Sequence, residues 1–261
     1  MPEPLIFALV AAVGLAVGSF LNVCIYRLPR HESLLLPASH CPACGRALTW
    51  YENIPVLSWV ALRGRCRTCG TRISVMYPLV ELAAGAIAVA WYVHFGLSFL
   101  FASRLVFALA LLVLFVIDLQ ERILPNMITV PGAIVGLALS FFGPPEQPGW
   151  RDSFIGLLAG GGGLWLLAEV WLRVRHEEGM GLGDVKMLAM IGAFLGWKVM
   201  FLTVMLSSVL GSVVGFAIIA ARIGDRKYQL PFGTFLALVA LVMCLAGEPA
   251  WSWYVGRFFY R

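Results

Sequence analysis

Charged residues are scarce in this 261-residue sequence: aspartate, glutamate, lysine and arginine make up 13% of it, about half the ~25% typical of soluble globular domains. Hydrophobic residues supply 61% of the chain, and the mean hydropathy is +0.88. An ordinary water-soluble domain is therefore excluded, and most of the chain is predicted to lie in lipid. The modest net charge of +5 is attributed to orientation in the membrane, not to binding of nucleic acid.

The usual catalytic signatures of soluble hydrolases are also missing. The four histidines are scattered, at positions 31, 40, 94 and 176, and the sequence contains no HExxH motif. No serine–histidine or cysteine–histidine arrangement stands out. If the chain is an enzyme, acidic residues are the candidates for its chemistry.

Apolar runs dominate what is present. They fall at about 5–26, 76–96, 98–117, 127–142, 154–172, 185–197, 199–221 and 230–246. Open sheets cannot cross lipid, and the runs lack the alternation of a membrane barrel. We therefore predict an all-α integral membrane protein with about eight transmembrane helices and one small polar insertion between the first two.

Lysine and arginine indicate the orientation. With the N-terminus outside, the cytoplasmic segments are 27–75, 118–126, 173–186 and 222–229, and they carry 14 of the 19 basic residues. Because positive charge accumulates on the cytoplasmic side, this orientation is favoured. The sequence thus divides into a first transmembrane helix (1–26), a cytoplasmic insertion (27–75) and a polytopic membrane domain (76–261).

Four of the six cysteines form two close pairs in that insertion. The pairs are Cys41-Pro42-Ala43-Cys44-Gly45 and Cys66-Arg67-Thr68-Cys69-Gly70, with 21 residues between them. Two CxxCG turns at such spacing are typical of zinc knuckles, in which four thiolates complete a tetrahedral shell. A closed shell leaves no position for water, so the zinc is predicted to be structural and to help fold the insertion. Two redox-active dithiols are the less favoured alternative.

A glycine-spaced turn leads into the sixth apolar run: Gly179-Met180-Gly181-Leu182-Gly183-Asp184-Val185-Lys186. From Asp184 to Trp197 there are about 14 residues, or ~20 Å of helix against a hydrocarbon core of ~30 Å. Asp184 is therefore expected to be recessed yet wetted from the cytoplasm. Helix N-capping is the alternative role for it. The glycines are expected to allow positive φ and the close approach of another chain, and Lys186 to anchor this end.

Asp118 ends the third apolar run. Arg104, 14 residues earlier, is expected to snorkel toward the outer face, which places Asp118 ~21 Å away near the inner boundary. Its alternative role is an ordinary interfacial acid paired with Arg122 at i, i+4. Pro125 and Asn126 then break the chain, and Asn126 is expected to cap the fourth helix.

Acidic residues at the edge of the hydrocarbon are costly, so a pair on one face calls for a reason. Two carboxylates that share a proton suit acid–base hydrolysis of a peptide bond. The ionised one accepts a proton from the attacking water, and the protonated one donates toward the carbonyl oxygen and then the leaving nitrogen. Asp118 and Asp184 are therefore predicted to form the active centre of a membrane-embedded protease.

The motifs also occur in a familiar order. They are Gly18-Ser19-Phe20-Leu21-Asn22-Val23, Tyr26-Arg27-Leu28-Pro29, the two cysteine pairs, Tyr77-Pro78-Leu79-Val80-Glu81, Asp118 with Pro125-Asn126, Gly181 to Lys186, and Pro231-Phe232-Gly233. Over nearly its whole length the chain resembles the bacterial type IV prepilin peptidases, of the GxGD aspartyl protease class. Thr234 stands where the family pattern has proline.

The resemblance implies an enzyme of the bacterial inner membrane whose zinc domain and active site face the cytoplasm. Such enzymes remove the basic leader of type IV prepilins and of type II secretion pseudopilins, and many then methylate the new N-terminal amine with S-adenosylmethionine. The resemblance makes Asp118 and Asp184 catalytic and the four cysteines metal ligands. Residues in the motifs around the aspartates are expected to position substrate or support the site: Gly181, Gly183, Lys186, Pro125 and Asn126.

The methyl-donor site is not placed by the sequence, because no glycine-rich nucleotide loop of a soluble methyltransferase is visible; Glu81, within a family motif, is a candidate. Three other interpretations remain open: a presenilin-like protease that cuts within the membrane, an ion-coupled transporter that uses the two aspartates, and a zinc-ribbon scaffold in which they are caps. The sequence does not give the oligomeric state or the distance between the aspartates.

Overall fold

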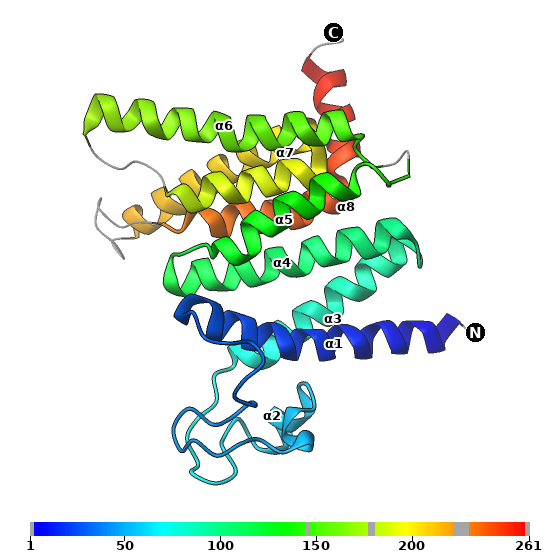
Figure 1. The fold of residues 1–261 in the computed structure, drawn as a ribbon, viewed down its shortest axis with the longest axis vertical. Coiled ribbons are helices and arrows are strands. Elements are labelled where there is room, and N and C mark those ends of the chain that lie inside the picture. The colour runs from blue at the N-terminus through cyan, green and yellow to red at the C-terminus, as the bar shows by residue number, and fades with distance from the viewer. Residues whose placement is uncertain (1–2, 145–146, 177–180, 222–229, 259–261) are drawn as a thin grey trace. The chain divides into compact units, whose positions relative to one another are not determined.

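The computed structural model describes residues 3–144, 147–176, 181–221 and 230–258, and within these ranges the fold is helical, without strands. The predicted all-α class is confirmed. The elements, shown in Figure 1, are α1 (Glu3–Arg27), η1 (Leu28–Arg30), η2 (Trp50–Asn53), α2 (Leu57–Ala61), α3 (Met76–Phe95), α4 (Phe99–Glu121), α5 (Asn126–Leu139), α6 (Trp150–Arg175), α7 (Leu182–Ala220) and α8 (Phe232–Phe258).

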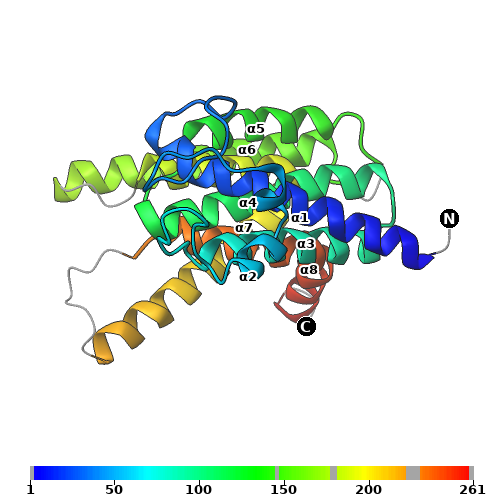
Figure 2. The same cartoon turned by 90° about the horizontal axis from the view of Figure 1, so that it is seen from below.

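Six of the described helices are long and apolar enough to cross a membrane: α1, α3, α4, α6, α7 and α8. The fourth apolar run forms the shorter α5, and the sixth and seventh runs are the two parts of α7. Their junction is Gly196, whose φ of 75° and ψ of 169° are not helical. The part of α7 after Gly196 leaves the direction of the part before it (Figure 2). The predicted short helix after Asp184 is confirmed, whereas the total of eight spans stays a prediction.

Residues 1–101 form one compact unit, here called the N-terminal unit. Its membrane part is α1 packed against α3, and the contact is built on small residues. A Cβ on Gly14 would lie 2.8 Å from the Ala88 Cβ, and a Cβ on Gly18 would lie 2.7 Å from the Glu81 Cα. Small residues let two helix backbones approach closely in lipid. The backbones of α1 and α3 are therefore in close contact at Gly14 and Gly18.

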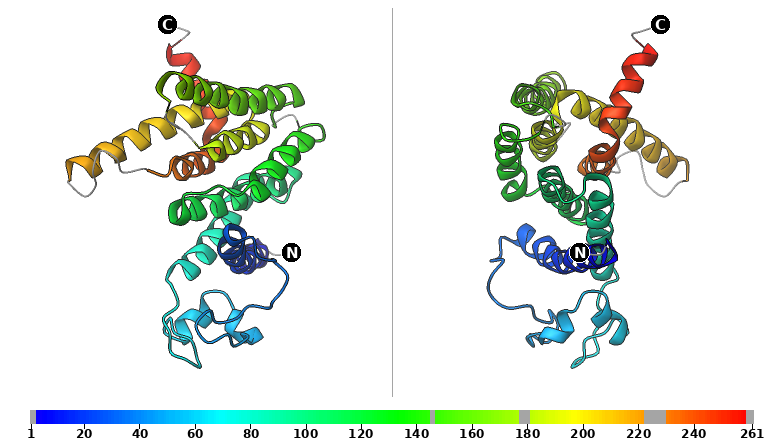
Figure 3. Two further views of the ribbon diagram at one scale, coloured as in Figure 1. Left: turned by 60° about the vertical axis from the view of Figure 1, so that its left-hand side comes forward. Right: turned by 90° about the vertical axis from the view of Figure 1, so that its right-hand side faces the viewer.

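Residues 102–261 form the second compact unit, the C-terminal unit. In it α7 packs against α5, α6 and α8, and the views in Figure 3 show its first part among these helices. Every residue from Val185 to Leu195 is buried or half-buried, as expected for a helix that is apolar on all sides. The α6 backbone approaches α7 closely at Gly160, where a Cβ would lie 2.7 Å from the Leu188 carbonyl oxygen, whereas a Cβ on Gly162 or Gly163 would meet no other atom within 4 Å.

The prediction that Arg104 snorkels to the outer surface is wrong. Arg104 is buried, and its Nη1 donates to the Phe194 carbonyl oxygen at 2.9 Å. The break at Gly196 ends the first part of α7, so carbonyls in its last turn lack partners within the helix. A cation suits that negative end of the helix. The ring of Phe107, one turn after Arg104, stacks on Phe194 at 4.4 Å and fixes the same junction.

Candidate active site and metal centre

Asp118 lies in the last turn of α4 and is only 5% exposed. Its Oδ2 accepts two hydrogen bonds from Thr234 in the first turn of α8, one from the backbone N–H at 2.5 Å and one from the hydroxyl at 2.9 Å. Gly233 makes the approach possible, since a Cβ there would lie 3.0 Å from the same oxygen. Burial and this bonding do not fit the alternative of an ordinary interfacial acid.

Asp184 is the third residue of α7, and the residue at the N-cap position is Gly181. The alternative role of Asp184 as the cap is therefore wrong, although an acid in the first turn still suits the helix dipole. Its side chain is half-buried, and no donor among the described residues bonds to its carboxylate. Unlike the buried carboxylate of Asp118, this one is open to a ligand.

The glycines of this turn act differently from what the sequence predicts. Gly181 has a φ of −70°, and Gly183 is helical, so neither uses the positive-φ region. Gly183 instead makes room for a side chain of the same chain, because a Cβ on it would lie 3.0 Å from the Leu124 Cβ. Gly179 and Met180 lie outside the described residues.

Leu124 connects the two aspartates. Its side chain packs against Gly183, the neighbour of Asp184, and against Gly233, the glycine beside the Asp118 carboxylate. The C-terminal end of α4, the start of α7 and the start of α8 therefore meet at one place in the C-terminal unit, with two acids of unequal burial.

A polar contact holds the start of α7 against the start of α5. The Lys186 Nζ donates to the Asn126 Oδ1 at 2.8 Å. The predicted capping role of Asn126 is wrong, because it is the first residue of α5 and Pro125 occupies the N-cap. Pro125 contributes its carbonyl oxygen, which accepts from the backbone N–H of Ile128 and Thr129. Lys186, Asn126 and Pro125 thus fix the helix ends next to Asp184.

The four cysteines of the N-terminal unit form one cluster, as the sequence predicts. The sulfur atoms of Cys41, Cys44, Cys66 and Cys69 all lie within 4.8 Å of one another. The two pairs form turns of the same kind. The Gly45 N–H donates to the Cys41 carbonyl oxygen at 2.8 Å, and the Gly70 N–H donates to the Cys66 carbonyl oxygen at 3.0 Å. Both glycines have φ near +70°, a backbone region that favours glycine. The donor set fits a thiophilic ion such as zinc.

The thiols of the cluster differ in acidity. Hydrogen bonding to Thr71, mainly to its hydroxyl and to a smaller extent to its backbone amide, lowers the pKa of Cys69 to about 6. A hydrogen bond with the Arg46 backbone amide lowers the pKa of Cys44. Desolvation and the neighbouring Cys41 and Cys69 thiols act in the opposite direction, and together they raise that pKa to about 11. Thiolates this close repel one another, and a divalent cation removes the repulsion.

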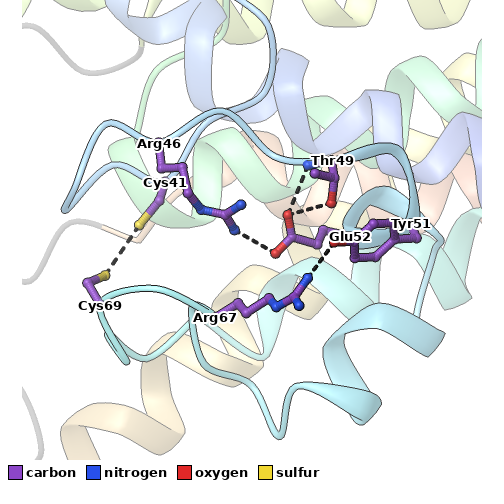
Figure 4. A network of polar contacts seen from close by, with 7 residues as sticks. All are labelled: Cys41, Arg46, Thr49, Tyr51, Glu52, Arg67 and Cys69. Atoms are coloured by element: carbon purple, nitrogen blue, oxygen red, sulfur yellow. Dashed lines mark hydrogen bonds and ion pairs between the residues drawn. The ribbon is translucent and has the colours of Figure 1, made fainter.

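Glu52 supports the cysteine cluster (Figure 4). Its carboxylate accepts from Arg46 Nη2 at 2.6 Å, from the Thr49 amide at 2.9 Å and from the Thr49 hydroxyl at 2.7 Å. The bond from Arg46, followed by those from Thr49, lowers the pKa of Glu52 to about 2. A carboxylate with a lowered pKa adds stability at pH values above its ordinary pKa, and that stability is lost progressively as the pH falls from there through about 2. Glu52 therefore stays ionised wherever the thiols can hold a metal.

Glu81 is also buried, with 8% exposure, on the second turn of α3. Its Oε2 accepts the backbone N–H of Val56 at 2.7 Å. This buried carboxylate therefore links α3 to the segment before α2.

Comparison with known proteins agrees with these two units. Residues 12–95 match the bacterial peptidase A24 N-terminal domain, and residues 105–216 match the type IV leader peptidase family. The chain is 39% identical to a prepilin leader peptidase/N-methyltransferase of Pseudomonas putida, over 96% of this chain and 94% of the relative. The chain belongs to the type IV leader peptidase family. Its predicted resemblance to that family is confirmed.

Other members of the leader peptidase family carry the same name. A Myxococcus xanthus protein is 43% identical over 85% of this chain and 67% of its own length, and an Aeromonas hydrophila protein is 36% identical over 97% and 95%. No solved structure matches the chain. Asp118 and Asp184 fall in the segment that matches the leader peptidase family, and the cysteines fall in the segment that matches the N-terminal domain.

Sequence reasoning passed over one residue of the site, Thr234. It is visible in the sequence only as a departure from proline after Pro231-Phe232-Gly233. Proline has no N–H and no hydroxyl, so the exchange to threonine adds two donors at this position. The departure from proline was visible in the sequence, but it could be assigned to the site only once the structure placed Thr234 beside Asp118.

Proposed function

We propose that this leader peptidase cleaves type IV prepilins and pseudopilins with Asp118 and Asp184 as its catalytic pair, and then N-methylates the exposed N-terminal residue. The observation that carries the peptidase half is the convergence of the helix ends that hold the two aspartates. Asp118 is buried and bonded to Thr234, and Leu124 packs against both Gly233, beside the Asp118 carboxylate, and Gly183, next to the more open Asp184.

The unequal surroundings of the carboxylates assign their roles. Oδ2 of Asp118 is occupied by two donors from Thr234, so Oδ1 is the oxygen that takes a proton from the attacking water. Asp184, which no described donor holds, donates its proton to the carbonyl oxygen. Asp118 then passes the proton it took from water to the leaving nitrogen, and Asp184 regains a proton from the gem-diol. Water adds to the carbonyl carbon, the C–N bond breaks, and the leader leaves with a new carboxylate. A presenilin-like protease or an ion-coupled transporter is not supported by the family membership.

We further propose that α5 and both parts of α7 cross the membrane, which gives eight spans. From Asn126 to Leu139 α5 has 14 residues, or ~21 Å, and the first part of α7 has a similar length. Such short spans recess the active site from the membrane surface. With the positive charge inside, the site and the cysteine insertion face the cytoplasm of a bacterium, where a prepilin presents its basic leader while its apolar helix lies in lipid.

The metal of the N-terminal unit is proposed to be one structural zinc ion held by Cys41, Cys44, Cys66 and Cys69. The support is the proximity of four thiols, a shell that leaves no place for reacting water. The methyl donor is proposed to be S-adenosylmethionine, which supplies an activated methyl group on sulfur. Residues 1–26, 27–75 and 76–261 remain our proposed division into first span, zinc domain and protease domain.

A prepilin incubated with the purified protein tests the proposed function. Mass spectrometry is expected to show loss of the leader alone without S-adenosylmethionine, and loss of the leader followed by gain of one methyl group when it is added. An intact prepilin would contradict the peptidase function. Cleavage without any methyl gain would contradict the methyltransferase function only.

Thr234→Val is expected to reduce kcat/KM for leader removal about tenfold, because one hydrogen bond to a charged carboxylate is lost while the backbone bond to Asp118 stays. Thr234→Ser keeps a hydroxyl and is the matched control, with near-normal activity. The comparison uses single-turnover cleavage of one prepilin. Equal rates for the valine and serine variants would show that the hydroxyl does not position Asp118.

A further inference from the structure

The N-terminal unit contains a cavity of about 390 Å³ between α1, α3 and the cysteine insertion. Its volume falls within the ~300–1,000 Å³ range of small-molecule sites. Residues on α1 and α3 line one side of it, and the segments around Cys41 and Cys66 line the other. The cavity lies wholly within residues that belong to this unit, and the proposed peptidase pair does not use it.

Three buried charges line this cavity, Arg27, Glu52 and Glu81, and Glu52 is already paired with Arg46. Arg27 is 5% exposed and Glu81 is 8% exposed. Arg27 donates only to neutral oxygens, the carbonyls of Ser33 at 2.7 Å and Pro37 at 2.6 Å. The Glu81 Oε2 accepts one backbone N–H, that of Val56. Among the described residues, neither has an oppositely charged partner.

An unpaired buried charge is expensive unless a partner compensates it. Glu52, the remaining buried charge of this unit, follows that rule, because it is paired with Arg46. Arg27 uses two of its five N–H donors, and Glu81 keeps Oε1 available. The cavity wall therefore offers a cation and an anion to a ligand that carries both charges.

Further groups around the cavity suit a nucleoside. The aromatic residues Tyr26, Trp59 and Tyr77 line it, and aromatic faces stack on bases. The Asn22 Nδ2 donates to the Tyr77 carbonyl oxygen at 3.0 Å, which leaves the Asn22 Oδ1 to accept from a hydroxyl or an amine. The combination of a carboxylate, a guanidinium, an amide and aromatic rings matches a zwitterionic amino acid joined to a nucleoside.

We propose that this cavity is the binding site of the methyl donor, S-adenosylmethionine, with Glu81 facing its positively charged groups and Arg27 its carboxylate. The inference rests on the proposed methyltransferase function and places it in the N-terminal unit. The two aspartates lie in the other unit, so each unit holds one activity. Because Cys41 and Cys66 line the same cavity, the zinc holds one wall of the donor site in place.

Titration calorimetry of the full-length protein with S-adenosylmethionine tests the site. Glu81→Gln keeps an oxygen for the Val56 N–H but removes the charge, and it is expected to raise the Kd roughly ten- to a hundredfold. Glu32→Gln is the matched control, because Glu32 is an exposed acid of the same unit that does not line the cavity. It is expected to bind as the unmodified protein does.

A second variant, Ser58→Phe, adds bulk inside the cavity without changing its charge, and it too is expected to weaken binding at least tenfold. Zinc content equal to that of the unmodified protein shows that each variant is folded. Unchanged Kd values for Glu81→Gln and Ser58→Phe would overturn the site and leave the methyltransferase function standing. Unmodified protein that neither binds the donor nor methylates cleaved prepilin would overturn both.

Discussion

Asp118→Asn and Asp184→Asn are each expected to lower the rate of leader removal by roughly 10²–10⁴-fold, the range of general acid–base catalysis. Asparagine has nearly the shape of aspartate but cannot take up or release the proton. In Asp118→Asn the side-chain oxygen can still accept from Thr234, so the end of α4 keeps its packing. The loss is therefore expected in kcat, with little change in prepilin binding.

Glu121→Gln is the matched control for these variants. Glu121 lies on the same last turn of α4 as Asp118 but is exposed, and no catalytic role is assigned to it. Cleavage rates and prepilin affinity measured on the three purified variants separate chemistry from folding and binding. Full activity of either asparagine variant would remove that aspartate from the catalytic pair.

Replacing Cys41 or Cys69 by serine is expected to abolish tight zinc binding and to unfold the cysteine insertion. Metal analysis should find about one zinc per unmodified chain. Structural zinc contributes about 10–16 kcal/mol to the folding of small zinc domains, and η2 and α2, the only helices described between η1 and α3, have four and five residues. Hydrogen exchange should therefore become fast in residues 27–75 after chelation, before it does so in α3.

Cys24→Ser and Cys244→Ser are the controls for the zinc experiment. Both cysteines are buried in helices, α1 and α8, and neither belongs to the cluster, so their loss should leave the zinc content unchanged. The cluster variants should also lose binding of S-adenosylmethionine, because the cavity loses a wall. A protected insertion in metal-free protein would contradict a structural zinc.

The sequence predicted those parts of the molecule that depend on local pattern. The CxxCG spacing predicted that Cys41, Cys44, Cys66 and Cys69 converge, and the cluster confirms it. The apolar runs predicted the helices, and the short run after Asp184 predicted the break near Trp197, which the structure places at Gly196. In each case, neighbouring residues in the chain carry the whole signal.

The contacts between distant segments were not predictable in the same way. Arg104 bonds to Phe194, 90 residues away, and Asn126 bonds to Lys186, 60 residues away. Rules for snorkelling and capping assume that water or the adjacent backbone is the partner, and here another helix replaces it. Thr234 and Asp118 are 116 residues apart, so the pattern of α8 alone could not assign Thr234 to the site.

Glu81 shows how a correct candidate can lack a reason in the sequence. Its place in a family motif made it a candidate near the methyl donor, but nothing else in the sequence supported that role. The structure adds that Glu81 is buried and accepts the Val56 N–H. The charge of Glu81 became informative only when the cavity, and Arg27 on the same wall, were located.

A double-mutant cycle tests most directly whether Asp118 and Asp184 act as one unit. Single-turnover cleavage of one prepilin is measured with the unmodified protein, Asp118→Asn, Asp184→Asn and the double variant. Groups that pass one proton between them are strongly non-additive, so the double variant should be about as slow as the slower single variant. Losses that multiply would mean that the two aspartates act independently, which would contradict a shared catalytic centre.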